Sequence, residues 1–378
     1  MRRFFSLPLL LLLLLVPSAA NAQEAKTWQF VVAGDSRNCG DVVMPLIAAG
    51  AKKANAAFYW HLGDFRALAN FDEDFAEESR LAEKPLTILG YMRMAWPDFI
   101  RNQVEPFAPV PFFPAIGNHE LYGKTRLDYV AQFADWLTQP AIQRQRLADD
   151  PGDHMTRPYY HWQIAGTDFI SLDNATPDMF DDAQLAWFER VLKADRENPA
   201  IHSIVVGMHA ALPHSLACDH SMNDYSAGEP TGSRVYRDLL GARTAGKQVY
   251  ILASHSHFVM SNIFNSDYWR NNGGVLPGWI IGTAGAIRYR LPAQSSQADF
   301  AQTDVYGYLL ATVNPAGSPP GTIRFDFRTV EKKDVPPDIV KRYSQALVDQ
   351  CFDGNKELRP AKDVDCDKAV PCTSPARP

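Results

Sequence analysis

Thiols, excess positive charge and long apolar runs are all scarce in this sequence. Its 378 residues include five cysteines, and none of them has a Cys-x-x-Cys or Cys/His spacing typical of zinc ligands, which argues against structural zinc. Acidic side chains outnumber basic ones, 43 to 37, for a formal net charge of −6. Because a surface that binds nucleic-acid polymers needs a basic patch, we expect no such partner.

The one long apolar run lies at the N-terminus. Two arginines precede the run Phe4–Val16, and small residues at 20–22 form the pattern of a signal-peptidase site. The run is too short for a comfortable membrane span, and no later stretch is longer. We therefore expect a signal peptide over 1–22, no stable membrane span, and a periplasmic or secreted mature protein.

Length bounds the domain organisation. The 378 residues less the 22 of the signal peptide leave 356, enough for one large α/β domain with insertions. We expect this domain over 23–335, with insertions at about 65–110 and 211–235. A C-terminal helix and a Cys-containing tail are expected over 336–378.

Apolar runs bounded by Gly, Pro and polar residues predict an α/β chain. The acidic run Phe71–Glu78 is interpreted as the solvated face of a helix. A helix is expected at 41–54, and an amphipathic helix at 181–194. Strands are expected at 28–33, 56–62, 111–116, 201–206, 248–252, 278–283, 306–313 and 322–330, with a β-hairpin over 159–164 and 168–172.

A polar side chain follows five of the predicted strands. One such residue is usually a turn residue, but ligands gather at the carboxyl ends of strands in α/β sheets. Five sets in a chain with ten histidines therefore predict a common site. Its members are Asp35, Asp64, Asn118, His209, and the pair His255 and His257.

These donor types predict a metal site. Oxygen and imidazole donors without thiolates suit Mn, Fe or Zn. Two such ions can hold a hydroxide between them, neutralise phosphate oxygens and stabilise an in-line displacement. Asp64 is predicted to bridge the ions. His119, next to Asn118, is placed to protonate the leaving group or to hold the phosphate.

The order of the motifs resembles the block pattern of the calcineurin-like metallophosphoesterases, the superfamily that includes the purple acid phosphatases: Gly34-Asp35, Gly63-Asp64, Gly117-Asn118-His119-Glu120, His209 and His255-Ser256-His257. The resemblance covers about 27–330 and implies a four-layer α/β/β/α sandwich. It also implies two divalent or trivalent metal ions (Mn, Fe or Zn), the first bound by Asp35, Asp64 and His257 and the second by Asp64, Asn118, His209 and His255. His119 would be the catalytic histidine, and a metal-bound hydroxide would hydrolyse a small phosphorylated substrate, either a phosphate monoester or a diester.

The chain departs from the family pattern in three places. Arg37 stands where many members have a His, Ala67 replaces the Tyr of purple-type sites, and Ser254 replaces a Gly. Arg37 cannot bind a metal, because it stays protonated and offers only donors, so the first site is one ligand short. Arg37 could instead clamp a substrate phosphate or pair with a carboxylate. His220 and Arg288 are further candidates for substrate contact, with a solvated strand end as the alternative for Arg288.

Cysteine usage suits an oxidising compartment. One disulfide is expected among the three tail residues Cys351, Cys366 and Cys372, although the sequence does not give the pairing. A second disulfide between Cys39 and Cys218, across the rim of the cleft, is predicted because each follows a segment with candidate ligands.

Two other classes of function compete with the phosphoesterase. Gly34-Asp35-Ser36 also resembles the nucleophile block of GDSL-type serine esterases, but that mechanism needs an Asp-x-x-His near the C-terminus, and no His follows His257. The second alternative is a non-catalytic or weakly active phosphate-ligand-binding protein on the same fold, which Arg37 keeps open.

Overall fold

The computed structural model describes residues 26–176, 179–218 and 220–357. The predicted signal peptide and two of the tail cysteines, Cys366 and Cys372, lie outside these residues. Within them, no helix combines the length and the apolar character that crossing a bilayer requires.

The strands form two sheets. The first sheet has the order β12-β11-β1-β2-β3 and the second β10-β8-β9-β7-β6-β5-β4. In the first sheet β1, β2 and β3 are parallel, and in the second β5, β6, β7 and β9 are parallel. The remaining pairings are antiparallel. The strands are β1 Trp28–Ala33, β2 Tyr59–His61, β3 Phe112–Pro114, β4 Tyr160–Ile164, β5 Thr167–Ser171, β6 Ser203–Gly207, β7 Gln248–Ala253, β8 Val259–Ser261, β9 Gly278–Ile281, β10 Ala301–Gln302, β11 Tyr306–Val313 and β12 Ile323–Val330.

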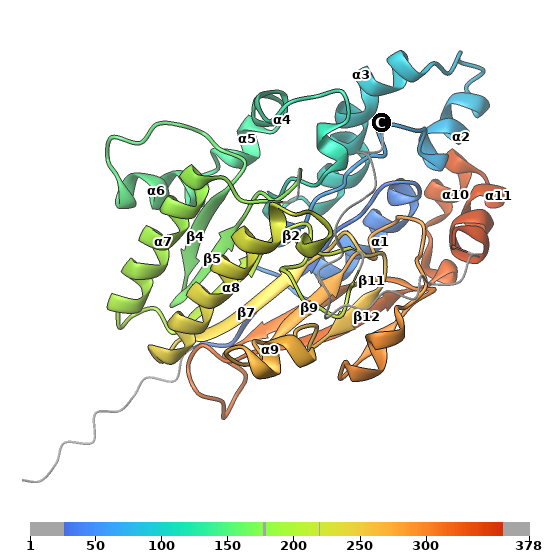
Figure 1. The fold of residues 1–378 in the computed structure, drawn as a ribbon. Helices are drawn as coiled ribbons and strands as arrows, with labels where there is room; N and C mark the ends of the chain where they lie inside the picture. Colours follow the sequence, from blue (N-terminus) through green and yellow to red (C-terminus); the bar gives the residue numbers. More distant parts are fainter. Residues whose placement is uncertain (1–25, 177–178, 219, 358–378) are drawn as a thin grey trace, which may run out of the picture.

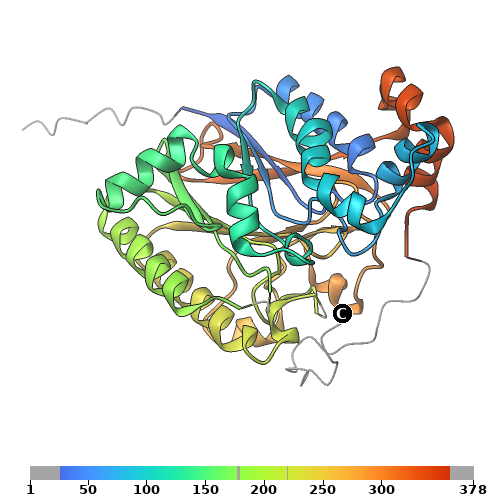
Figure 2. The same cartoon turned by 90° about the horizontal axis from the view of Figure 1, so that it is seen from above.

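Helices cover the outer face of each sheet (Figures 1 and 2). Helix α1 contacts β11 and β12 of the first sheet, and α8 contacts β7 of the second. The two sheets face each other between these helical layers, so the predicted four-layer α/β/β/α sandwich is confirmed. The helices are α1 Gly40–Lys53, α2 Glu73–Leu81, α3 Ile88–Phe99, α4 Arg126–Gln132, α5 Ala134–Leu137, α6 Pro140–Asp149, α7 Asp182–Glu197, α8 Gly228–Thr244, α9 Asp267–Asn271, α10 Pro337–Tyr343 and α11 Gln345–Asp349.

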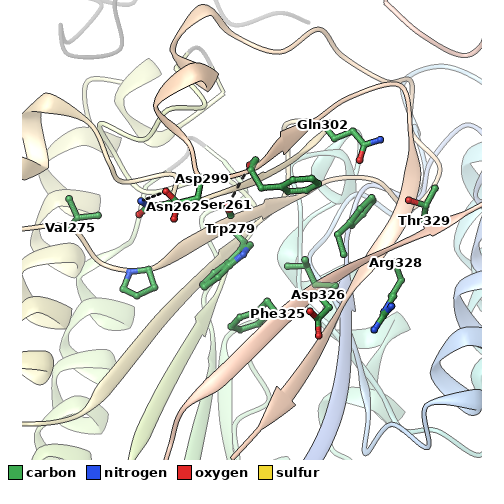
Figure 3. Close-up of a pocket in the computed structure, with 14 residues that line it drawn as sticks. Ser261, Asn262, Val275, Trp279, Asp299, Gln302, Phe325, Asp326, Arg328 and Thr329 are labelled. Atoms are coloured by element: carbon green, nitrogen blue, oxygen red, sulfur yellow. Dashed lines mark hydrogen bonds between the residues drawn. The ribbon is translucent and has the colours of Figure 1, made fainter. Parts of the chain in front are cut away.

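A groove of about 720 Å³ lies along β12 and the β8–β10 end of the second sheet (Figure 3). Its walls are aromatic side chains from both sheets, with Asp326 and Arg328 at their edge. None of the predicted ligands lines this groove, so the groove is separate from the candidate site. The aromatic residues are Trp279, Phe300, Phe325 and Phe327.

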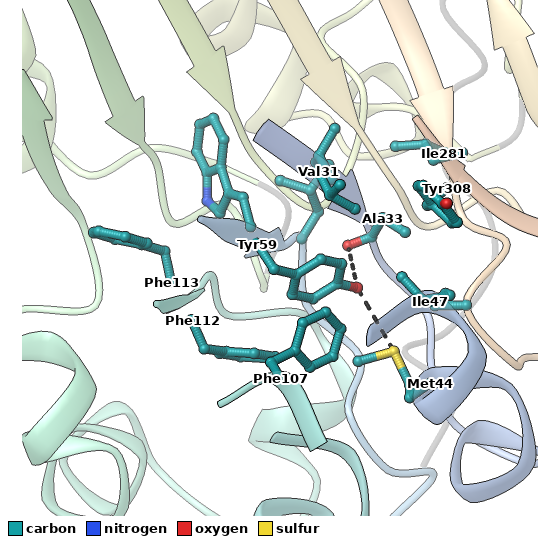
Figure 4. Packing of buried hydrophobic residues seen from close by; sticks show 14 of the residues in the cluster. Val31, Ala33, Met44, Ile47, Tyr59, Phe107, Phe112, Phe113, Ile281 and Tyr308 are labelled. Atoms are coloured by element: carbon teal, nitrogen blue, oxygen red, sulfur yellow. Dashed lines mark hydrogen bonds between the residues drawn. The ribbon is translucent and has the colours of Figure 1, made fainter. Parts of the chain in front are cut away.

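Alternation along the strands divides the first sheet between two cores. Tyr59 turns to the α1 side, where its hydroxyl lies 3.6 Å from the sulfur of Met44 (Figure 4). Trp60, the next residue, turns to the second sheet and packs edge-on against Trp162. A side chain at Gly207 of β6 would clash with the Trp60 ring, so this glycine lets the two sheets approach at the strand end that carries His209.

The acidic run over 71–78 differs from the prediction. A helix does form there, but Asp72 and Asp74 are fully buried rather than solvated. Both face the buried guanidinium of Arg66, which lies 2.8 Å from Asp74 Oδ1. The partner that buries these carboxylates comes from the preceding loop, which the local charge pattern does not reveal.

The disulfide prediction for Cys39 is wrong. Cys39 is bonded to Cys351, 312 residues away, and not to Cys218. The same bond shows that Cys351 does not pair within the tail. The bond attaches the segment after α11 to the loop that precedes α1, next to the candidate site.

Candidate metal centre

The predicted ligands converge because both sheets present the carboxyl ends of their parallel strands at one place. Asp35 follows β1, Asp64 follows β2, and His255 follows β7. All three residues have a left-handed backbone, with φ angles of 60°, 60° and 66°. Such angles are uncommon outside glycine and cluster at functional sites, where they turn a side chain sharply out of the strand direction.

Asp35 is held by the loop that follows β7. Its Oδ2 accepts hydrogen bonds from the hydroxyl of Ser254 and, at 2.7 Å, from the backbone N–H of His255. Its Oδ1 lies 3.1 Å from Nε2 of His257. A Cβ at Gly34 would overlap Ser254, so the glycine before Asp35 makes room for the serine that replaces the usual Gly of the last block.

Asp64 has one satisfied and one unsatisfied oxygen. Its Oδ1 accepts a 2.9 Å hydrogen bond from the backbone N–H of His119 and lies 3.3 Å from Nε2 of His209. Its Oδ2 is buried and has no hydrogen-bond partner among the described residues. A buried carboxylate oxygen without a donor is costly, and a bound cation is one of the few partners that would satisfy it.

Glu120 ties together the loops that carry Asp64 and Asn118. Its carboxylate accepts 2.8 Å hydrogen bonds from the backbone N–H groups of Asp64, Phe65 and Gly117. Burial and the nearby Asp64 raise the pKa of Glu120 to about 8. Although Glu120 belongs to the sequence motif, its role as an anchor of two loops appears only in these contacts.

Three of the histidines turn Nε2 towards the centre, whereas His255 turns Nδ1, which lies 3.0 Å from Nε2 of His209. In His209, Nδ1 lies 2.9 Å from the backbone carbonyl of Leu62. In His257 it lies 2.7 Å from the carbonyl of Ile287, and in His119 it lies 2.6 Å from the carbonyl of Ala67. A carbonyl can only accept, so Nδ1 carries the proton and the Nε2 lone pair of a neutral ring faces the cluster. This arrangement of an outer hydrogen bond behind each ring is the usual one for metal-binding histidines.

Two groups of donors meet the geometric needs of a metal ion, and they share Asp64. The first group is Asp35, Asp64 and His257, and the second group is Asp64, His209 and His255; within each, the donor atoms lie within 4.8 Å of one another. The side-chain oxygen of Asn118 lies 3.0 Å from Nε2 of His209, which adds it to the second group. The second group therefore offers carboxylate, amide and imidazole donors that fit a divalent ion.

Charge within the cluster shifts several pKa values. Burial opposes ionisation of Asp64, but His209 and His119 hold the pKa of Asp64 well below its ordinary value. Burial likewise opposes ionisation of Asp35, and His257 nevertheless keeps its pKa low. Burial disfavours the charged form of His209, yet Asp64 raises the pKa of His209 to about 10. An ion bound by the second group would replace that proton, because coordination needs the neutral imidazole.

Arg37 lies against the first group. Its Nη1 is 2.5 Å from Nε2 of His119, and its Nη2 is 3.1 Å from Nε2 of His257. Its Nε lies 3.8 Å from the unsatisfied Oδ2 of Asp64. The guanidinium therefore contacts two of the three residues that the sequence predicts for the first ion.

Two aromatic rings border this cluster. Tyr289 stacks on His257 with ring centroids 3.9 Å apart, and its hydroxyl oxygen lies 3.4 Å from Nη2 of Arg37. The ring of His220 lies 5.3 Å from that of His255 and 5.1 Å from that of Tyr289. His220 thus lies at the edge of the cluster, beside His255 and Tyr289. Tyr289 is missing from the predicted site, because nothing distinguishes it from its neighbours in the sequence.

Arg288 does not fit the substrate-binding role predicted for it. Its side chain is buried and donates to the backbone carbonyls of Asn355, Asp304 and Cys351, and it lies over the ring of Tyr306. These contacts fix the segment that follows α11 and leave the guanidinium directed away from the cluster. The adjacent Tyr289 reaches the cluster instead.

Comparison with known proteins gives matches at the level of structure. No protein-family model and no curated protein sequence matches the chain. A purple acid phosphatase from seeds of yellow lupin (Lupinus luteus) matches with a TM-score of 0.50 at 16% identity, covering 82% of this chain and 52% of the lupin chain. A dimetal phosphatase from Danio rerio matches with a TM-score of 0.49 at 12% identity, covering 80% of this chain and 97% of that chain.

This chain thus spans about half the length of the lupin enzyme. At such low identity the likeness bears on the fold alone. The arrangement of two mixed sheets between helical layers agrees with it. The chain has the calcineurin-like metallophosphoesterase fold.

Proposed function

We propose that the protein is an exported, metal-dependent phosphoesterase that hydrolyses small phosphate monoesters or diesters. The observation that carries this proposal is the buried Asp64, which belongs to both donor groups and whose Oδ2 has no hydrogen-bond partner among the described residues. No nucleic-acid polymer is proposed as a substrate, because the chain has a net negative charge.

The second group would hold the ion. Asp64, Asn118, His209 and His255 supply its donors. A divalent ion bound there lowers the pKa of a coordinated water molecule and neutralises phosphate oxygens. Mn, Fe and Zn all suit these donors.

Arg37 and His119 would act on the substrate. Arg37 is a fixed cation with several N–H donors, which is the form of side chain that binds phosphate oxygens. His119 is oriented by its 2.6 Å hydrogen bond to the carbonyl of Ala67. Its Nε2 faces the cluster and would exchange a proton with the substrate or hold one of its oxygens.

Export is supported by the disulfide between Cys39 and Cys351. Disulfides of this kind persist in oxidising compartments. The periplasm or the extracellular space is therefore the proposed location, in agreement with the signal peptide expected from the sequence.

A serine esterase is the weaker explanation for the same loops. Nε2 of His61 does lie 2.9 Å from Oγ of Ser36. Both residues are fully buried, however, and the other ring nitrogen of His61 accepts from the backbone N–H of Gly63 rather than facing a carboxylate. Ser36 therefore has neither access to an ester nor the orienting carboxylate that the mechanism needs.

A phosphate-ligand-binding protein without catalysis is the second candidate. The position of Arg37 favours it, since the guanidinium lies among donors that catalysis by two ions would need. Turnover distinguishes the two candidates, because both would bind phosphate.

The test is the Asp64→Asn variant, with Asp135→Asn on the exposed face of α5 as the matched control. Loss of a shared ligand should lower metal content and reduce hydrolysis of p-nitrophenyl phosphate and bis-p-nitrophenyl phosphate by more than the roughly 10–100-fold that loss of an outer partner costs. Chelator treatment should do the same to the wild type, and added Mn, Fe or Zn should restore activity. Full metal content and full turnover in Asp64→Asn would refute the proposal. A metal-loaded wild type without turnover on either substrate would favour the binding protein.

A further inference from the structure

We infer that the guanidinium of Arg37 takes the place of the first metal ion, so that the chain binds one ion, in the second group, rather than two. This inference deepens the proposed function and rests on it only for the second group. It differs from the two-ion expectation drawn from the family pattern.

The guanidinium already lies against two of the three residues that a first ion would need, and it donates a hydrogen bond to one of them, His257. His257 has its Nδ1 proton on the carbonyl of Ile287 at 2.7 Å, so Nε2 is its one free donor. That nitrogen accepts from Nη2 of Arg37 at 3.1 Å. The carboxylate of Asp64 faces Nε of Arg37 at 3.8 Å. An ion in the first group would have to displace Arg37 from both residues.

The two residues that follow Arg37 fix its loop in place. The side chain of Asn38 donates to Glu73 at 2.8 Å and accepts from the backbone N–H of Ile287 at 3.2 Å, and its own N–H donates to Asp72 at 2.6 Å. The next residue, Cys39, is bonded to Cys351. The backbone of Arg37 is thereby held in place, and only rotation of its side chain could vacate the first group.

Rotation out of the first group is unfavourable. The guanidinium side chain is only 14% exposed and lies against the hydroxyl of Tyr289 as well as the two histidines. A histidine or a lysine could lose its proton and with it its positive charge, but the guanidinium of an arginine stays charged. If it stayed, it would repel a divalent ion bound a few ångströms away, and the low exposure of Arg37 and Asp64 limits the screening of this repulsion by solvent.

The same geometry leaves the second group open. Arg37 makes no hydrogen bond or ion pair with Asn118, His209 or His255, so their donor atoms remain available to an ion. Asp64 faces Arg37 through Oδ2 and His209 through Oδ1. Asp64 thus lies between the guanidinium of Arg37 and the ion that the second group would bind.

Metal stoichiometry tests this inference without reference to turnover. Purified wild-type protein is stripped with chelator, saturated with Mn²⁺ or Zn²⁺, freed of unbound ion, and analysed for ions per chain by mass spectrometry of the elements. We expect one ion per chain for the wild type and for Arg93→His, an exposed arginine on α3. Arg37→His should bind two, because it removes the guanidinium and supplies an imidazole. Arg37→Gln should bind a second ion more weakly than Arg37→His.

The outcomes separate this inference from the proposed function. Two ions per wild-type chain, or one ion in a folded Arg37→His variant, would overturn the role of Arg37, whether or not the protein hydrolyses phosphate esters. One ion per wild-type chain with no hydrolysis would overturn the proposed function and support the inference. If Arg37→His fails to fold, calorimetric titration of the wild type with Mn²⁺ still decides, because two binding events of similar affinity contradict the inference.

Discussion

Replacement of Arg66 by methionine should cause one of the largest losses of stability available in this chain. Arg66 is a fully buried cation that contacts four buried carboxylates. It lies 2.5 Å from Asp41, 2.8 Å from Asp74 and 3.8 Å from Asp72, and it also donates to Asp98. These acids come from α1, from the start of α2 and from α3, so the hub joins three helices to the loop that follows Asp64.

The expected loss of stability comes from the buried carboxylates that the substitution leaves without a cation. Removing one partner of a buried ion pair typically costs about 3–5 kcal/mol, because the other charge stays buried without compensation. Here one cation serves four carboxylates, so we expect a loss near the upper end, about 5 kcal/mol. That is a large share of the roughly 5–15 kcal/mol by which domains are normally stable. Methionine replaces the aliphatic stem but not the guanidinium of the fully buried Arg66, so a cavity adds to this loss.

The loss should depend on pH with a definite sign. Burial raises the pKa of Asp98 to about 6 from its ordinary 3.8, against the opposing effect of Arg66. Without Arg66 the folded-state pKa of Asp98 rises further, because Arg66 is the charge that lowers it most. A folded-state pKa above the unfolded one makes stability fall as pH rises through the interval. The deficit of Arg66→Met should therefore be smaller at about pH 5 than at about pH 7.5.

Chemical denaturation of both proteins at the two pH values measures this. Arg93→Met, at an exposed position on α3, controls for the substitution itself. A double variant with Asp98→Asn should recover part of the loss, since it removes one uncompensated charge. A deficit below about 1 kcal/mol at neutral pH, the size of an exposed ion pair, would refute the assignment of Arg66 as a charge hub. A deficit that grows on acidification would refute the reasoning about the carboxylates.

Two further predictions concern contacts other than those of the metal ligands. Replacing both Cys39 and Cys351 by serine should lower the free energy of unfolding by about 2–5 kcal/mol, because the bond closes a very long loop. A reductant should lower the free energy of unfolding of the wild type. An equal decrease in the variant would contradict this. His161 lies 2.8 Å from Asp168 and 2.5 Å from Asp149, and against burial these acids raise the pKa of His161 to about 10. The wild type should therefore be more stable than His161→Gln below the unfolded-state pKa of His161, about 6.5, and this advantage should be lost as pH rises towards about 10. Denaturation experiments across this pH range measure the difference in free energy of unfolding. A difference that does not change with pH would argue against a charged His161.

The strand-end ligands could be predicted because their signal is local. Each follows an apolar run, and parallel strands bring their carboxyl ends to one edge whatever the loops do. The same holds for most elements: β11 spans the predicted residues, and the hairpin of β4 and β5 forms as expected. Boundaries shift where backbone pairing ends early, as in β2, which is shorter than the apolar run that predicts it.

Contacts between distant segments could not be predicted. Cys39 and Cys351 are separated by 312 residues, and no spacing rule connects them. Arg288 looked suited to a phosphate because its charge is visible in the sequence, whereas the carbonyls that use its donors are not. The buried aspartates at the start of α2 looked solvated for the same reason, since their partner Arg66 lies in the preceding loop.

Charge balance supports the inference that Arg37 and one external ion share the site. Asp35 and Asp64 are both fully buried, and two buried carboxylates require two positive charges nearby. Before any ion binds, Arg37 supplies one of these charges and the proton on His209 supplies the other. The proton can be exchanged for a metal ion, whereas the guanidinium cannot be neutralised. The replacement of a His by Arg37 therefore does more than remove a ligand: it makes one of the two positive charges a permanent part of the chain and leaves the other to be set by the supply of metal.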